Sequence, residues 1–150
     1  MNKITPFLWF DHQAEEAANF YVSVFKNSSI SNVMRAGEKV MGVNFTLEGQ
    51  AFLSLNGGPL YPFTPAISLY VNCETQAEVD TLWTRLSADP ASERCGWLKD
   101  KYGLSWQIIP SALPQLLQDP DRAKANRVIQ AMMQMKKIDV DALRAAAQSQ

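Results

Sequence analysis

The sequence predicts an α+β fold made of two related modules, followed by a helical extension. Three observations support this prediction. Several short segments alternate apolar and polar residues as strands do, and two longer ones repeat apolar residues at helical spacing. The order of strand, helix and further strands occurs over residues 1–58 and again over 65–110. The remaining residues, 111–150, show helical patterning alone.

The first module begins with a strand and a helix and ends in a three-stranded meander. The helix has one apolar stripe, which includes Ala17, Tyr21 and Val24. Turns at Gly37-Glu38 and Gly49-Gln50 separate the meander strands. The predicted elements are a strand at 4–10, a helix at 13–26 and strands at 29–36, 40–48 and 51–57.

The second module repeats this order with weak sequence identity. Gln13-Ala14-Glu15, at the start of the first helix, recurs as Gln76-Ala77-Glu78. Segment 88–95 is short and contains Pro90, so the first strand of its meander is expected to be stunted or lost. The predicted elements are a strand at 67–72, a helix at 76–87 and a hairpin with strands at 96–101 and 104–109.

The extension, residues 111–150, has its own helix signals. Asp119-Pro120 offers an N-cap followed by a first-turn proline, and Asp139 can cap a last helix that runs through Leu143. Val128, Met132 and Met135 share one helical stripe. The slight excess of basic residues here is interpreted as a solvated helical face.

Composition argues against several kinds of partner. Lys and Arg total 14 against 15 Asp and Glu, a net charge of −1, so no strong positive field attracts nucleic acid. No apolar run approaches the roughly 18 residues of a membrane span. Pro6 and Asp11 interrupt the first apolar run, so no signal peptide is expected. We therefore expect a cytoplasmic protein that binds neither nucleic acid nor membrane.

The reactive side chains are few. Cys73 and Cys95 are expected to be reduced thiols, since the sequence shows no export signal. They are also expected to be inert, because no histidine is available as a base for either of them. The single histidine, His12, follows Asp11 and is expected in the turn between the first strand and helix. One histidine excludes any site that needs two.

Residue parity divides each strand between two sheet faces. One face is predicted to be apolar and to pack on the helices; among its residues are Leu8, Phe10, Leu53 and Leu55. The other face mixes aromatic and neutral polar groups, as small-molecule pockets do. Its predicted ligand-binding residues are Phe7, Trp9, Asn44, Phe52, Ser54, Ser68, Tyr70 and Gln107. Alternatively, the C-terminal helices or a partner subunit cover this face. Lys99-Asp100-Lys101, next to Trp97, is interpreted as a solvated turn, with the alternative that it places one ammonium at the mouth of the cup.

Three segments carry a family resemblance: ITPFLWFDHQAEEAANFYVSVF (4–25), CGWLKDKYGLSWQIIP (95–110) and RVIQAMMQMKKIDVDAL (127–143). With these segments the chain resembles the PhnB-like branch of the vicinal oxygen chelate superfamily, whose members are often named 3-demethylubiquinone-9 3-methyltransferase-like. Glyoxalase I and the bleomycin resistance proteins are relatives. The resemblance implies a glyoxalase-like fold, a curved mixed sheet around a cup, and a homodimer. Met132, Met133 and Met135 could supply the dimer contact or pack within the chain.

Metalloenzymes of this superfamily hold their metal at four strand positions, which correspond here to Thr5, Ser54, Ala66 and Gln107. These residues offer no carboxylate or imidazole, so we expect neither a metal nor another cofactor. Methyl transfer is also not expected, because the glycine-rich turn of the common nucleotide-fold enzymes is absent and Gly57-Gly58 leads into Pro59.

These observations predict a protein that binds a small, mostly neutral organic molecule in a metal-free cup. Two alternatives stay open. One is a metal-dependent lyase, isomerase or dioxygenase whose ligands lie elsewhere on the cup. The other is a structural or interaction module in which the C-terminal helices fill the cup face. The sequence does not decide whether any reaction is catalysed.

Overall fold

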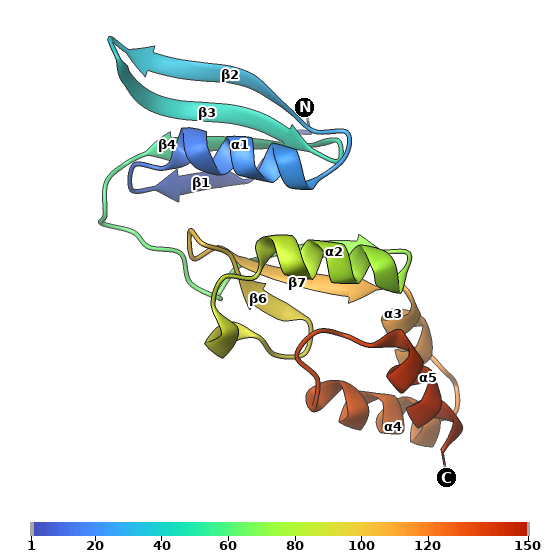
Figure 1. The fold of residues 1–150 in the computed structure, drawn as a ribbon. Helices are drawn as coiled ribbons and strands as arrows, with labels where there is room; N and C mark the ends of the chain where they lie inside the picture. The colour runs from blue at the N-terminus through green and yellow to red at the C-terminus, as the bar shows by residue number, and fades with distance from the viewer. Residues whose placement is uncertain (1, 150) are drawn as a thin grey trace. The chain divides into compact units, whose positions relative to one another are not determined.

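The structure, a computed structural model, describes residues 2–149 and confirms the α+β class (Figure 1). Two mixed sheets, of four and three strands, are accompanied by helices that include a C-terminal group. The chain divides into two compact units, with the boundary between Phe63 and Thr64. We call them unit 1 and unit 2 and describe each by itself. No helix within residues 2–149 has the length and apolar character needed to cross a membrane.

Unit 1 contains a four-stranded sheet in the order β1-β4-β3-β2. Strand β1 runs parallel to β4, and the other neighbours are antiparallel. The first strand starts at Phe7 and not at residue 4, because Pro6 has no amide hydrogen to donate to a sheet. The elements are β1 (Phe7–Phe10), α1 (Ala14–Val24), β2 (Ser29–Ala36), β3 (Lys39–Leu47) and β4 (Gln50–Asn56).

Helix α1 covers one face of this sheet. Its alanines Ala14, Ala17 and Ala18 are fully buried, and their small side chains allow close approach of the helix. The amide of Ala14 donates to Asn56 Oδ1 at 2.9 Å, so a residue of β4 caps the helix, while Gln13 makes no side-chain capping bond. The helix and β4 are thereby fixed to each other.

Unit 2 repeats the arrangement with one strand fewer. Its sheet has the order β5-β7-β6, in which β5 is parallel and β6 antiparallel to β7. The short 3₁₀ helix η1 (Pro90–Ser92) stands where the first meander strand would be, which confirms the expected loss of that strand. The other elements are β5 (Ser68–Cys73), α2 (Gln76–Leu86), β6 (Trp97–Lys99) and β7 (Ser105–Pro110).

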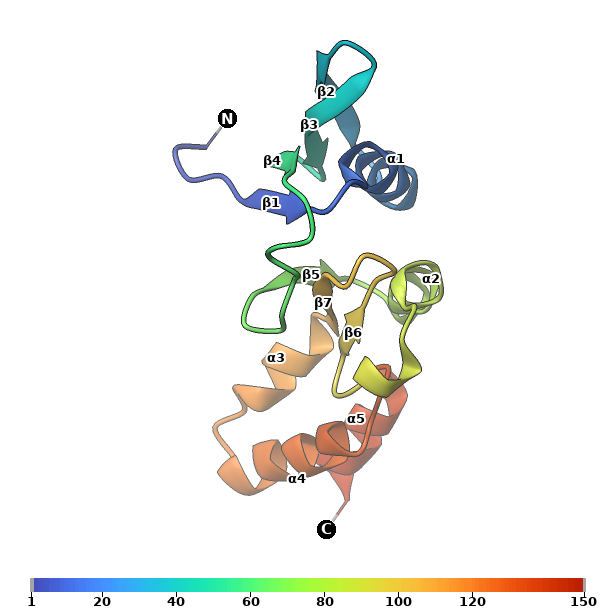
Figure 2. The same ribbon diagram turned by 90° about the vertical axis from the view of Figure 1, so that its left-hand side faces the viewer.

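Figure 2 shows α2 on one side of this sheet and α3 on the other. The three C-terminal helices pack around a small apolar core that includes Ile109 from β7. Met132 and Met135 pack against this core, whereas Met133 is 56% exposed. Homodimerisation through these methionines stays a prediction. The helices are α3 (Ala112–Leu117), α4 (Arg122–Met133) and α5 (Val140–Gln148).

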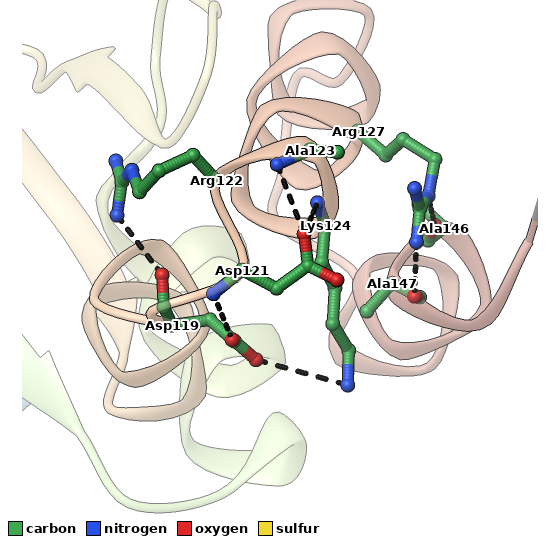
Figure 3. A network of polar contacts seen from close by, with 8 residues as sticks. All are labelled: Asp119, Asp121, Arg122, Ala123, Lys124, Arg127, Ala146 and Ala147. Atoms are coloured by element: carbon green, nitrogen blue, oxygen red, sulfur yellow. Dashed lines mark hydrogen bonds and ion pairs between the residues drawn. The ribbon is translucent and has the colours of Figure 1, made fainter.

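Polar contacts join the last two helices (Figure 3). The guanidinium of Arg127 in α4 donates to the carbonyls of Ala146 and Ala147 in α5 at 3.2 and 2.9 Å. The N-cap of α4 is Asp121 and not the predicted Asp119. The Asp121 carboxylate accepts bonds from the amides of Ala123 and Lys124, so the helix starts two residues later than predicted. Asp119 instead accepts a bond from the Asp121 amide at 2.9 Å.

Candidate functional site

The face of unit 1 opposite α1 carries three of the predicted ligand-binding residues. Strand pairing sets Phe7 beside Leu53 and Trp9 beside Leu55, and alternation along β3 puts Asn44 on the same face. Phe7 is 56% exposed. The Trp9 indole donates to the Gly58 carbonyl at 2.9 Å, so its ring is held in place.

The structure places Phe52 and Ser54 on the other face of that sheet, beneath α1. Ser54 pairs with Leu8, and Phe52 pairs with the core residue Phe45. Phe52 is 5% exposed and Ser54 fully buried, with its hydroxyl donating to the Val43 carbonyl at 2.6 Å. The parity predicted for strand 51–57 is therefore wrong by one residue. Leu53 and Leu55, predicted for the core, lie instead beside Phe7 and Trp9.

The remaining predicted residues come together in unit 2. Tyr70 and Gln107 are paired neighbours on β5 and β7, and Gln107 is also paired with Trp97 on β6. The Gln107 amide donates to Ser68 Oγ at 3.0 Å. Its Oε1 has no hydrogen-bond partner in the described part of the chain. We call the face shared by Ser68, Tyr70, Trp97 and Gln107, opposite α2, the open face of unit 2.

Lys99 is a residue of the open face, which agrees with the less favoured alternative for segment 99–101, an ammonium at the mouth of the cup. It pairs with Ser105 and lies two positions from Trp97, so both side chains leave β6 on the same side. The interpretation of segment 99–101 as a solvated turn overlooked this parity, although Trp97 and Lys99 belong to one predicted strand. The open face therefore carries one cation and is not free of charge.

Two cavities adjoin the open face. The smaller, of about 270 Å³, is lined by sheet residues and by apolar residues of α3 and α4. The larger, of about 580 Å³, lies along β6 and η1. Cys95 and Trp97 line both, which makes the two cavities neighbours. The smaller cavity is lined by Tyr70, Cys95, Trp97, Gln107, Ile109, Leu113, Pro114, Leu117 and Met132.

Unit 1 has a cavity of about 710 Å³ beside the start of α1, but its chemistry differs. Its lining includes Asp11, Glu15, Glu16 and Lys39 and contains no Phe, Tyr or Trp. Glu15 is already paired with Arg35 at 2.9 Å. Such a charged, exposed hollow does not resemble the apolar, aromatic lining of most small-molecule sites.

The four superfamily metal positions carry none of the side chains that divalent cations prefer. Ser54 is turned toward α1 and already bonded, and Ala66 has no donor atom. Thr5 donates its hydroxyl to the Asn2 carbonyl at 3.2 Å. Divalent cations prefer carboxylate or imidazole ligands, which all four positions lack. Across residues 2–149, no group of three or more His, Cys, Asp and Glu side chains is placed to hold a metal ion.

Both cysteines are free. Cys73 is fully buried, and the pKa of its thiol is raised to about 12. Burial is the largest cause, and the negative charges of Glu78 and Glu74 add to it. It therefore stays protonated and unreactive near neutral pH. Cys95 is half-buried beside the two cavities. His12 lies in the turn between β1 and α1, as predicted, and its imidazole is 3.7 Å from the Asp11 carboxylate.

Residues 2–109 match the family model described as 3-demethylubiquinone-9 3-methyltransferase. The chain belongs to this family. A PhnB protein from Bacillus cereus, which bears the same family name, is 41% identical over 73% of this chain and 100% of its own, with a TM-score of 0.65. The resemblance predicted from the sequence is thereby confirmed.

More distant structures share the fold. A Pseudomonas aeruginosa protein is 19% identical, with a TM-score of 0.57 over 73% of this chain and 98% of that chain. A glyoxylase/bleomycin resistance protein/dioxygenase domain from a Frankia species is 12% identical, with a TM-score of 0.51 over 73% of this chain and 92% of that chain. The glyoxalase-like fold is confirmed. No curated protein matches the chain.

Proposed function

We propose that this PhnB-family protein binds a small organic molecule on the open face of unit 2 and does so without a resident metal. The observation that carries the proposal is the alignment of Tyr70, Gln107 and Trp97 across three neighbouring strands, where they line one cavity of about 270 Å³. The unbonded Gln107 Oε1 offers an acceptor with which to orient a ligand.

The remaining walls of this cavity favour an apolar ligand body. Ile109, Leu113, Leu117 and Met132 are aliphatic, and methionine adapts its shape to varied ligands. A mostly apolar pocket with a few placed polar groups is the usual design of a small-molecule site. The face of unit 1 that carries Phe7, Trp9 and Asn44 also combines aromatic and amide groups. We propose it as a second ligand-binding surface.

The donor atoms give little support to the metal-dependent alternatives. Thr5, Ser54, Ala66 and Gln107 supply no anionic ligand, so they would not hold a Lewis acid that polarises a substrate. The family name does not by itself assign methyl transfer. The turns from β1 to α1 and from β5 to α2 contain no glycine, unlike the phosphate-binding turn of nucleotide-fold enzymes.

The test is a thermal-shift screen of small aromatic and aliphatic compounds, followed by titration of the hits. Gln107→Leu should weaken binding about tenfold, because a hydrogen bond to the ligand is lost while volume is nearly kept. Gln130→Leu makes the same change at an exposed position of α4 and should bind as the wild type does. Binding that is unchanged in Gln107→Leu would refute the proposed site.

The metal-dependent alternative is tested on protein purified without chelators. The proposal expects a metal content well below one ion per chain by elemental analysis. Stoichiometric zinc, nickel, manganese or iron, retained through dialysis, would contradict a metal-free site and support the alternative.

A further inference from the structure

The side chain of Lys99 defines one end of the open face. It lines the cavity of about 580 Å³ together with Trp97 and Ser105. Lys99 is half-buried, and within residues 2–149 its ammonium forms no ion pair. Lys124 and Lys137, by contrast, each pair with an aspartate, at 3.7 and 2.8 Å. An ammonium that has no carboxylate partner and lines a cavity is available to bind an anion there.

The other charges that line this cavity favour one negative charge and not two. Arg94 lines it as a second, exposed cation. Asp89 also lines it, and its carboxylate is held in place by the Ala91 amide at 3.1 Å. The Asp89 carboxylate would repel a dianionic phosphate more strongly than it would repel a ligand with a single negative charge, such as a carboxylate.

The neighbouring cavity supplies room for the rest of such a ligand. Trp97 and Cys95 line both cavities, so a molecule held at Lys99 can extend past Trp97 toward Gln107. Ser105, the strand partner of Lys99, and Ile109 are four positions apart on β7. At about 3.3 Å per residue, this separation is about 13 Å, enough for an extended medium-chain molecule and more than enough for a bicyclic one.

We infer that the ligand is an amphipathic monocarboxylate, with its acid group at Lys99 and its apolar body along Trp97 toward Ile109 and Leu117. The inference rests on the proposed function and names the ligand class of the same face. Lys99 is the residue that selects the acid over a neutral molecule of the same shape. Leu117 and Met132, on the C-terminal helices, limit the length of the body.

The experiment compares acids with their neutral amides: 2-naphthoic acid against 2-naphthamide, and octanoic acid against octanamide. Each is titrated at pH 7 into the full chain, with tryptophan fluorescence and calorimetry as readouts. At least one acid should bind about tenfold more tightly than its amide, as a charge-assisted bond predicts. Lys99→Met should abolish this preference by weakening the binding of the acid far more than that of the amide.

Lys101→Met is the matched control, because it removes the same charge from the same hairpin. The Lys101 ammonium lies 5.5 Å from the centroid of the Tyr102 ring, and Lys101 lines neither cavity. This variant should keep the preference for the acid. A preference that persists in Lys99→Met, or is lost equally in Lys101→Met, would show that Lys99 does not select the acid.

The remaining outcomes separate this inference from the proposed function. Equal binding of acid and amide by the wild type overturns the assignment of the acid group and leaves the proposed function standing. If 2-naphthyl phosphate binds more tightly than 2-naphthoic acid, the assignment of the acid group as a carboxylate is wrong and a phosphate replaces it. If neither probe pair binds and the compound screen gives no hit, the proposed function fails and this inference fails with it.

Discussion

At the scale of single residues, Asp100 explains the turn in one of the segments that carry the family resemblance, 95–110. Its carboxylate is 3% exposed and accepts three hydrogen bonds. The amides of Tyr102 and Leu104 donate to Oδ1 at 2.8 and 3.1 Å, and the Trp106 indole donates to Oδ2 at 2.9 Å. Gly103 supplies the positive φ of 85° that the turn needs. Asp100 is therefore structural: its bonds shape the hairpin between Lys99 and Gln107.

Asp100→Asn should destabilise the protein by about 1–3 kcal/mol, because the amide nitrogen that replaces one carboxylate oxygen cannot accept a bond in this buried site. Urea denaturation followed by circular dichroism measures the change. Asp141→Asn, at an exposed position of α5, is the control and should shift the midpoint little. Equal midpoints for the two variants would show that the Asp100 bonds contribute nothing to stability.

Single residues also show how far the site could be predicted from sequence. Ser68, Tyr70 and Gln107 were assigned to one face, and the structure brings them together because β5 and β7 each alternate clearly. For Lys99 the sequence favours a solvated turn over an ammonium at the cup mouth, because the charge stands next to a Tyr-Gly turn. Its parity with Trp97 was the available signal. That the wall includes Leu117 could not be predicted, since nothing in the sequence indicates how α3 packs on the sheet.

At the scale of elements, the order of strands and helices could be predicted, but the orientation of β4 could not. Its residues Phe52, Leu53 and Leu55 are apolar on both faces, so alternation does not indicate which side packs on α1. A shift of one residue moves every side chain of a strand to the opposite face. The pairing of Leu8 with Ser54 determines which side of β4 packs on α1. This pairing joins segments far apart in the sequence, so the residues of β4 alone do not indicate it.

The contact between α4 and α5 depends on Arg127, whose guanidinium binds two carbonyls at the end of α5 (Figure 3). Those carbonyls lie in the last turn of α5, where the helix dipole makes a cation favourable. Arg127→Met should lower the free energy of unfolding by about 1 kcal/mol, allowing for partial exposure. Arg144→Met, at an exposed position of α5, serves as the control in the same thermal melts. Identical melting temperatures would contradict the role of Arg127.

At the scale of the whole molecule, the family model ends at residue 109, but the compact unit does not. Hydrogen bonds join the C-terminal segment to the preceding part of unit 2 at several points. The amides of Cys95 and Gly96 donate to the carbonyls of Met135 and Lys136, both at 2.8 Å. Gln76 of α2 accepts a bond from the Val140 amide at 2.8 Å. These contacts make α3–α5 part of unit 2. Leu113 and Leu117 of α3 and Met132 of α4 also form one wall of the cavity at the proposed site.

Unit 2 should therefore fold when it is produced alone as residues 64–150, because it has its own core and keeps these bonds. A shorter chain, 64–110, should fail to fold, since Ile109 and the amides of Cys95 and Gly96 lose their partners. Circular dichroism and thermal melts distinguish the two chains. Retention of the acid preference by 64–150 would also support a ligand site within this unit. A cooperative melt of 64–110 would show instead that the C-terminal helices are dispensable for folding.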